Sequence, residues 1–255
     1  MSETNQDELA GTEQPFVQHL IELRDRLVKA TLAVVVAAAA LALYPGPAQL
    51  YDILAAPLVA QLPSGATLIA TSVISPFLVP LKILMMTAFL MALPVVLYQT
   101  WAFVAPGLYS HEKKLVLPLV VSSTLLFLVG VAFCYFFVFG QVFAFIQSFA
   151  PKSITAAPDI EAYLGFVITM FIAFGLAFEV PIVVIVLARM NVVSIDKLKD
   201  FRSYFIVLAF IIAAIVTPPD VVSQLALAIP MCILYEIGIW AAQLFIKHTQ
   251  APDAE

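Results

Sequence analysis

Glu179 is the most unusual chemical group in the sequence. It stands alone in an otherwise uncharged apolar run from Tyr163 to Leu187. An acidic group near the middle of a membrane helix costs about 3 kcal/mol, so such residues tend to mark functional contacts or ion pathways. A carboxyl group satisfied by a polar neighbour on an adjacent helix is the structural alternative. The residue alone leaves both interpretations open.

A second acidic group, Glu22, lies on a short amphipathic helix predicted between Phe16 and Leu27, in which apolar residues recur at i, i+4, i+7 and i+11. The polar side of this helix carries His19, Glu22 and Arg26 at spacings of three and four. The alternative to a functional role is a solvated ion pair, because exposed pairs are common and contribute little to stability.

The connection from Gln99 to Lys114 combines aromatic residues, a Pro-Gly bend and the third carboxylate of interest, Glu112. A carboxylate can accept two hydrogen bonds from one guanidinium group. Glu22 and Glu112 on one face would therefore suit a ligand with two arginines better than a ligand with two lysines. For the aromatic side chains an interfacial belt is an equally good interpretation. These aromatic residues are Trp101, Phe103 and Tyr109.

Catalytic patterns are missing from the sequence. We find no His-Glu-x-x-His, no Gly-x-Ser-x-Gly, no pair of aspartates in apolar runs and no glycine-rich phosphate loop. Cys134 and Cys232 lie in apolar runs at a spacing that fits no metal site, and we interpret both as packing residues. Asp52 and Asp220 fall in predicted turns, where aspartate often caps a helix. We therefore predict no enzyme, no cofactor and no metal.

The composition indicates an all-α polytopic membrane protein. Of the 255 residues 63% are hydrophobic and 11% are charged, against about 25% charged in a typical soluble domain. The apolar blocks have helical length, which excludes a membrane β-barrel. The first 15 residues are polar and acidic, so no cleavable signal peptide is expected, and nothing in the sequence indicates nucleic-acid binding.

Six transmembrane helices are predicted in one membrane domain covering residues 1–255, made of a polar leader (1–15), a six-helix core (16–246) and a tail (247–255). A structured cap on the membrane face is expected between the first two helices, at residues 45–76, because prolines divide this stretch into pieces too short to span. The predicted spans are 27–44, 77–99, 115–140, 163–187, 204–216 and 221–246.

The last two spans are expected to be short. The fifth has 13 residues, or about 20 Å of helix against about 30 Å of hydrocarbon, and Pro230 interrupts the sixth. Such a mismatch demands a partner or a thinned bilayer. Ten lysines and arginines fall on the side of the termini and only Lys82 and Lys152 on the other, which predicts cytoplasmic termini and an extracytoplasmic cap.

Several motifs together resemble the TatC family, the large subunit of the twin-arginine translocase, over nearly the whole chain. These motifs are His19-Leu-Ile-Glu-Leu-Arg-Asp-Arg26, Ser75-Pro-Phe77, Trp101-Ala-Phe-Val-Ala-Pro-Gly-Leu-Tyr109 with Glu112, Phe178-Glu-Val-Pro181 and Thr217-Pro-Pro-Asp220. The resemblance implies a receptor and core scaffold in the bacterial inner membrane that binds twin-arginine signal peptides of folded precursors. It also implies recruitment of TatA-like and TatB-like single-span subunits, assembly with other copies of itself, and export driven by the proton-motive force.

The resemblance also assigns roles to individual residues. It implies a signal-peptide surface made of Glu22, Arg24, Gln99, Phe103, Leu108 and Glu112. It implies partner docking at Glu179, Thr217 and Gln224, and functional sensitivity at Pro57 and Asp220.

Two other classes of function remain as alternatives. A proton-coupled secondary transporter would use Glu179 to bind and release a proton, although the sequence shows no clear internal repeat. A purely structural membrane scaffold would tolerate alanine at Glu22 and Glu112.

Overall fold

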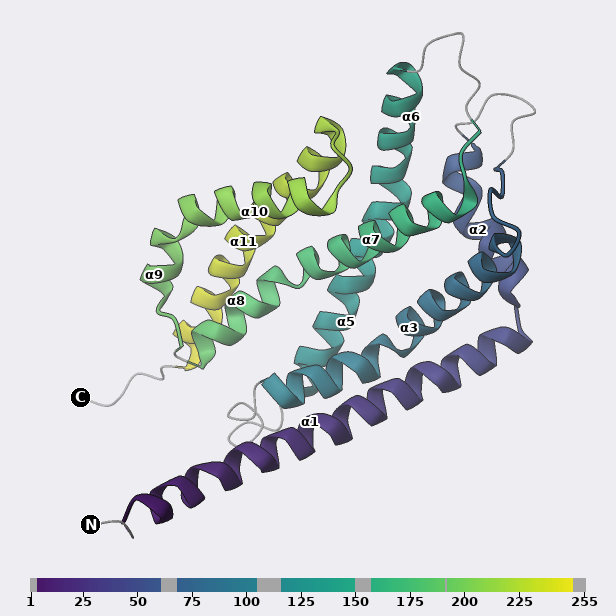
Figure 1. Cartoon of the computed structure of the whole chain (residues 1–255). Coiled ribbons are helices and arrows are strands. Elements are labelled where there is room, and N and C mark those ends of the chain that lie inside the picture. Colours follow the sequence, from purple (N-terminus) through teal and green to yellow (C-terminus); the bar gives the residue numbers. More distant parts are fainter. Residues whose placement is uncertain (1–3, 61–67, 105–115, 150–156, 191, 250–255) are drawn as a thin grey trace.

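The computed structural model describes residues 4–60, 68–104, 116–149, 157–190 and 192–249 (Figure 1). Helices form the regular structure of these ranges, apart from an isolated bridge between Ile69 and Asp159, so the predicted all-α class is confirmed. The elements are α1 (Thr4–Leu43), α2 (Pro47–Val59), α3 (Ser75–Val104), α5 (Val116–Phe133), the π-helix η2 (Cys134–Val138), α6 (Phe139–Phe149), α7 (Ile160–Phe178), α8 (Val180–Arg189), α9 (Ile195–Asp200), α10 (Arg202–Val216) and α11 (Val221–Thr249).

Helix lengths within the described ranges identify five segments that are long and apolar enough to cross a bilayer. They are Val17–Leu43, Ser75–Val104, Leu117–Phe149, Ile160–Arg189 and Val221–Leu244. α10 has only 15 residues, about 22 Å of helix, and confirms the predicted shortness of the fifth apolar helix. The sixth is not short, because α11 has 29 residues and continues through Pro230. An interior proline in a packed apolar helix can bend it without ending it.

The third and fourth apolar segments also differ from the prediction. The third continues through η2 into α6 as far as Phe149, because Gly140 lies in helical conformation and the apolar residues after it keep helical spacing. The fourth is two helices rather than one, since α7 ends at Phe178 and α8 begins at Val180. Pro181 has no amide hydrogen for the carbonyl group four residues earlier, which explains a break at this point.

A tight turn separates α1 from the short helix α2. Gly46 has a φ of 89°, a left-handed conformation that glycine adopts without steric cost, and Pro47 starts α2 at the position where proline is preferred. With 13 residues α2 is too short to span a bilayer, as expected for a piece of the 45–76 stretch. Ser194 caps α9, where its hydroxyl accepts the Lys197 amide at 3.4 Å.

The helices pack mainly as neighbouring pairs. α1 lies along α3, α5 along α7, and α11 along α8 and α10 (Figure 1). α1 begins and α11 ends at the same end of the bundle, whereas α2, the end of α6 and the start of α7 gather at the opposite end (Figure 1). The two ends therefore present different elements to their surroundings.

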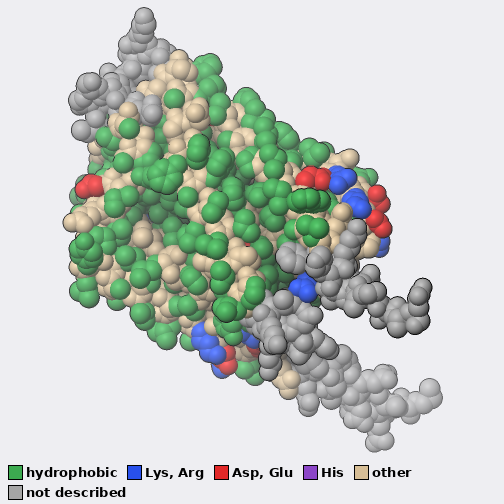
Figure 2. Space-filling model, turned by 180° about the vertical axis from the view of Figure 1, so that it is seen from behind, with side chains coloured by type: hydrophobic (Ala, Val, Ile, Leu, Met, Phe, Trp, Pro, Cys, Tyr) green, Lys and Arg blue, Asp and Glu red, His purple; other side chains and the backbone are tan. Residues whose placement is uncertain are grey.

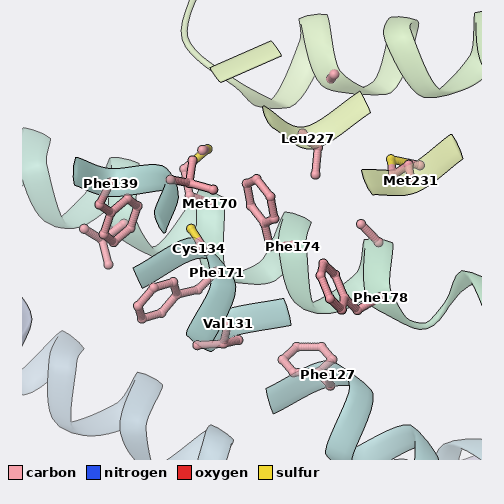
Figure 3. Close-up of a cluster of buried hydrophobic side chains, with 14 of the residues drawn as sticks. Phe127, Val131, Cys134, Phe139, Met170, Phe171, Phe174, Phe178, Leu227 and Met231 are labelled. Atoms are coloured by element: carbon pink, nitrogen blue, oxygen red, sulfur yellow. The ribbon is translucent and has the colours of Figure 1, made fainter. Parts of the chain in front are cut away.

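The core is built from large aromatic and aliphatic side chains. Phe139 and Phe174 are fully buried, and Phe139 stacks on Phe171 with ring centroids 5.5 Å apart. Leu227 and Met231 of α11 complete the same cluster, together with Cys134, which supports the interpretation of that cysteine as a packing residue (Figure 3). The face of the molecule seen in Figure 2 is largely hydrophobic as well, with charged side chains near its margins. This distribution suits a protein surrounded by lipid.

Two glycines allow α5 and α7 to approach closely. A Cβ atom at Gly130 would lie 2.5 Å from the carbonyl oxygen of Phe174, and one at Gly175 would lie 2.3 Å from the ring of Phe127. Both distances are shorter than any tolerable contact, so the helix pair depends on these glycines. Small residues at helix contacts are a common means of close packing in membranes.

Gly130→Ala should lower the free energy of unfolding by about 2 kcal/mol, because the backbone of α7 must move away. Gly165→Ala is the matched control on α7. It has no atom within 4 Å of the added Cβ and should be neutral or stabilise by up to about 1 kcal/mol. Denaturant unfolding in lipid nanodiscs measures both changes, and equal values for the two variants would contradict the packing argument.

Candidate functional site

Glu179 lies at the junction of α7 and α8 and is 6% exposed. Its Oε2 accepts a hydrogen bond from the hydroxyl of Ser123 on α5, and this hydroxyl in turn accepts the indole N–H of Trp101 on α3 at 2.9 Å. Ser123 is fully buried and Trp101 is 8% exposed. Three helices thus contribute to one buried hydrogen-bonded chain, which we call the Trp101–Ser123–Glu179 chain.

The second carboxyl oxygen of Glu179 is different. Its Oε1 is buried and has no hydrogen-bond partner among the described residues. Leaving a buried polar atom unpaired costs about 1–3 kcal/mol, and such atoms in native structures are often completed by a ligand. One carboxyl oxygen is therefore hydrogen-bonded to an adjacent helix, as the structural interpretation of Glu179 expects. The other is unpaired, as expected for a residue that makes a functional contact.

Glu22 lies near the start of the apolar part of α1. Both Nε and Nη2 of Arg26 donate to its Oε1, at 2.9 and 2.6 Å. Its Oε2 lies 4.0 Å from Nδ1 of His19, and the ring of His19 stacks on that of Phe103 with centroids 4.3 Å apart. The predicted ion pair is present, and the helix that carries it packs directly on the last turn of α3.

The other residues expected at the signal-peptide surface form no hydrogen bond or ion pair with the Glu22 side chain in the described structure. Arg24 is 71% exposed in its side chain and pairs with Asp25 at 2.8 Å, so it points away from Glu22. Gln99 is half-buried on α3, one turn before Phe103. Leu108 and Glu112 lie outside the described residues.

The residues expected to dock a partner helix sit beside the turn between α10 and α11. The hydroxyl of Thr217 donates to the carbonyl of Ala213 at 2.8 Å, and Nε2 of Gln224 donates to the carbonyl of Phe210 at 3.4 Å. Asp220 accepts the Ser223 amide at 2.7 Å and so caps α11, the structural role considered for it from the sequence. These side chains lie on elements different from the one that carries Glu179.

Pro57 has a clear structural consequence in the cap. A proline at this position cannot donate to the carbonyl of Ile53, and that carbonyl accepts the hydroxyl of Tyr135 at 2.6 Å instead. The adjacent carbonyl of Leu54 accepts the hydroxyl of Tyr163 at 2.8 Å. Tyr135 and Tyr163 therefore anchor α2 through backbone carbonyl groups one turn before Pro57.

A polar cluster at the same end joins α3 to α7. Glu161 accepts from Lys82 at 2.9 Å and from Ser75 at 2.8 Å, so Lys82 forms an ion pair where the sequence suggested only an interfacial position. Asp159 caps α7 and accepts the hydroxyl of Thr71. The Ala162 amide and the Thr71 hydroxyl hold the pKa of the Asp159 carboxyl below its usual range.

Sequence reasoning missed the role of Ser123, and it considered Trp101 only as a possible belt residue. The available signal was the polar triplet Ser122-Ser123-Thr124 inside the third apolar run. Hydroxyl groups there can donate to their own helix or to a neighbour, and the sequence does not distinguish the two. Among the described residues no group of three His, Cys, Asp or Glu side chains could hold a metal ion.

Fold and site together define a polytopic helical membrane protein with an acidic side chain, Glu22, beside stacked rings at one end and a buried carboxyl group, Glu179, in its interior. A family model described as Sec-independent protein translocase protein (TatC) matches residues 18–230. The chain belongs to the TatC family, as its motifs predicted. This is a family of protein translocase components rather than of enzymes or secondary transporters.

The similarity to known relatives extends over most of the chain. This chain is 51% identical over 240 residues to the TatC protein of Halothiobacillus neapolitanus. The matched region covers 94% of this chain and 65% of that longer relative. The chain is 46% identical to the Escherichia coli K12 TatC protein, covering 91% of this chain and 90% of the relative. A crystal structure described as the twin arginine translocase receptor TatC is 40% identical, with a TM-score of 0.75 over 89% of this chain and 98% of that one.

The anchoring of the cap can be tested at Tyr135. Tyr135→Phe should lower the free energy of unfolding by about 1 kcal/mol, because the Ile53 carbonyl loses its donor. In a Pro57→Ala background the new amide can donate to that carbonyl, so the same change should cost less. Tyr204→Phe is the matched control, since the Tyr204 ring is 70% exposed. An equal cost of Tyr135→Phe in both backgrounds, measured by unfolding in nanodiscs, would contradict the assignment.

Proposed function

We propose that this chain is the receptor and core scaffold of a twin-arginine translocase, and that it receives signal peptides at the surface formed by Glu22 and Phe103. The contact between His19 of α1 and Phe103 of α3 carries this proposal, because it brings the acidic helix and the aromatic connection together. The solved relative described as a twin arginine translocase receptor supports the same role.

The charge arrangement at Glu22 suits a guanidinium ligand. Arg26 binds only Oε1, so Oε2 remains for a second donor beside the stacked rings of His19 and Phe103. Arginine forms planar bidentate contacts with carboxylates and stacks on aromatic faces, and lysine does neither as well. Glu112 is proposed to supply the second carboxylate, with Arg24, Gln99 and Leu108 around it.

The proposed topology is one membrane domain with six spans, of which α10 is the short one. Both termini are proposed to be cytoplasmic and α2 to belong to an extracytoplasmic cap. The basic residues assigned to the side of the termini support this orientation. The location of the two helix ends at one end of the bundle supports it as well (Figure 1). The inner membrane of a bacterium is the proposed location.

Partners are proposed to bind inside the membrane. The unpaired Oε1 of Glu179 offers a polar contact to an inserted signal peptide or to a partner helix. Thr217 and Gln224 border the short α10, whose outward residues leave a large apolar surface to be covered. We propose TatA-like and TatB-like single-span subunits and further copies of this chain as occupants, with export driven by the proton-motive force.

Reversal of the acidic charges tests this proposal. Glu22→Lys combined with Glu112→Lys should reduce photo-crosslinking of a twin-arginine signal peptide to a probe at Phe103 by tenfold or more. A reduction of this size corresponds to the loss of one hydrogen-bonded pair between a carboxylate and a guanidinium group. Asp196→Lys is the control, because this exposed acid lies on α9, which packs against α10 and α11 rather than against α1 or α3. Undiminished crosslinking in the double variant would show that the peptide binds elsewhere.

A further inference from the structure

Ser123 is the only described residue that hydrogen-bonds to both Trp101 and Glu179. Its oxygen accepts the indole N–H, and its single hydrogen is therefore directed toward the carboxyl group. Without the indole, the hydroxyl would lose one of its two partners and could rotate toward the backbone of its own helix. The position of the carboxyl group thus depends on a residue from the last turn of α3.

The neighbouring hydroxyls show what Ser123 would otherwise do. Ser122 donates to the carbonyl of Pro118 at 2.8 Å, and Thr124 donates to the carbonyl of Val120 at 2.7 Å. Both hydroxyls are satisfied by their own helix, one turn earlier. A serine hydroxyl in this helix therefore has two discrete arrangements, one toward its own backbone and one toward a neighbouring helix.

The last turn of α3 links this hydroxyl to the recognition surface. Phe103 follows Trp101 by two residues on that turn and stacks on His19 of α1. The Trp101 ring also packs against Ile182 and Val186 of α8, just beyond Glu179. A ligand that displaces Phe103 must strain the same turn that holds the indole N–H.

We propose that Ser123 is a positioning residue that couples the recognition surface at Phe103 to Glu179. In one arrangement Trp101 holds its hydroxyl on the carboxyl group. In the other, the last turn of α3 has moved, the hydroxyl returns to its own helix and both carboxyl oxygens become available to a partner. This inference rests on the proposed function, since it names the ligand at Phe103 as a signal peptide. A two-state element that both sites bias is the physical requirement for such coupling.

The test uses a tryptophan signal that only one residue can give. The chain has two tryptophans, and Trp240 is 68% exposed, so Trp240→Phe leaves Trp101 as the sole site for 5-fluorotryptophan. In this background four proteins are compared in lipid nanodiscs: the parent, Ser123→Ala, Glu179→Ala and the double variant. The fluorine resonance of Trp101 and the Kd for a synthetic twin-arginine signal peptide are measured for each.

Glu179→Ala should shift the Trp101 resonance and change the peptide Kd about fivefold when Ser123 is present. In the Ser123→Ala background it should leave the Trp101 resonance unchanged and have a smaller effect on the Kd, since the connection through the hydroxyl is already lost. Thr124→Val is the matched control, because it removes a buried hydroxyl that bonds only to its own helix. It should leave both effects of Glu179→Ala intact.

Two results would overturn the coupling. One is an effect of Glu179→Ala that is the same with and without the Ser123 hydroxyl, which would assign the coupling to another route. The other is the absence of any effect on the resonance in the parent. If the parent binds no twin-arginine peptide, the proposed function fails, whereas the fluorine resonance still reports on the link between Glu179 and Trp101.

Discussion

A carboxyl group inside a hydrocarbon environment is the constraint on which the rest of this structure depends. Glu179 is buried, and the Ser123 hydroxyl supplies one of its hydrogen bonds. In water such a bond would contribute little, but in a low-dielectric interior an unpaired polar atom is expensive, so the donor must be held in place. Trp101 performs that function from a third helix.

The close approach of α5 and α7 makes this arrangement possible. Gly130 and Gly175 let the two helices touch, and the same pair carries Ser123 and Glu179. The break before Pro181 then turns α8 toward α11, where Gly238 packs against the backbone of Pro181. The packing of small residues and the hydrogen bond to the carboxyl group are therefore two parts of one helix contact.

The opposite end of the molecule is held by polar contacts of another kind. Asp159 and Glu161 at the start of α7 bind the segment that leads into α3, and two tyrosine hydroxyls anchor the cap helix. These contacts fix α7 at one end, and the contact to Ser123 fixes it at the other. Motions that accompany binding should therefore fall on α3 and α8 near Trp101 rather than on α7 itself.

Much of this architecture follows from simple patterns in the sequence. Apolar length and turn residues predict the helices, and the shortness of α10 is visible from the apolar run of only 13 residues at 204–216. Motifs identify the family and its acidic residues. The break between α7 and α8 at Glu179 is harder to predict from the sequence. Val180-Pro181 after the glutamate is compatible either with the first turn of a new helix or with a kink in a continuous one. The third apolar segment continues beyond its predicted end at residue 140, because Gly140 adopts helical conformation and α6 runs on to Phe149.

The partners of buried polar groups could not be predicted at all. Ser122, Ser123 and Thr124 have similar side chains, yet only Ser123 points toward another helix. Which of three adjacent hydroxyls faces a carboxyl group depends on the rotation of α5 against α7, and the close contacts at Gly130 and Gly175 constrain that rotation. Single-residue propensity contains no such information.

The central claim is that Glu179 acts through its hydrogen bonds, and substitution by glutamine and by alanine tests it most directly. Export of a twin-arginine precursor by cells that depend on this chain should remain within about threefold of the parent in Glu179→Gln, because the amide oxygen still accepts from Ser123. It should fall by tenfold or more in Glu179→Ala, which removes the acceptor of the Ser123 hydroxyl at the junction of α7 and α8. Equal export by both variants, at equal amounts of folded protein, would contradict the account and make Glu179 a dispensable core group.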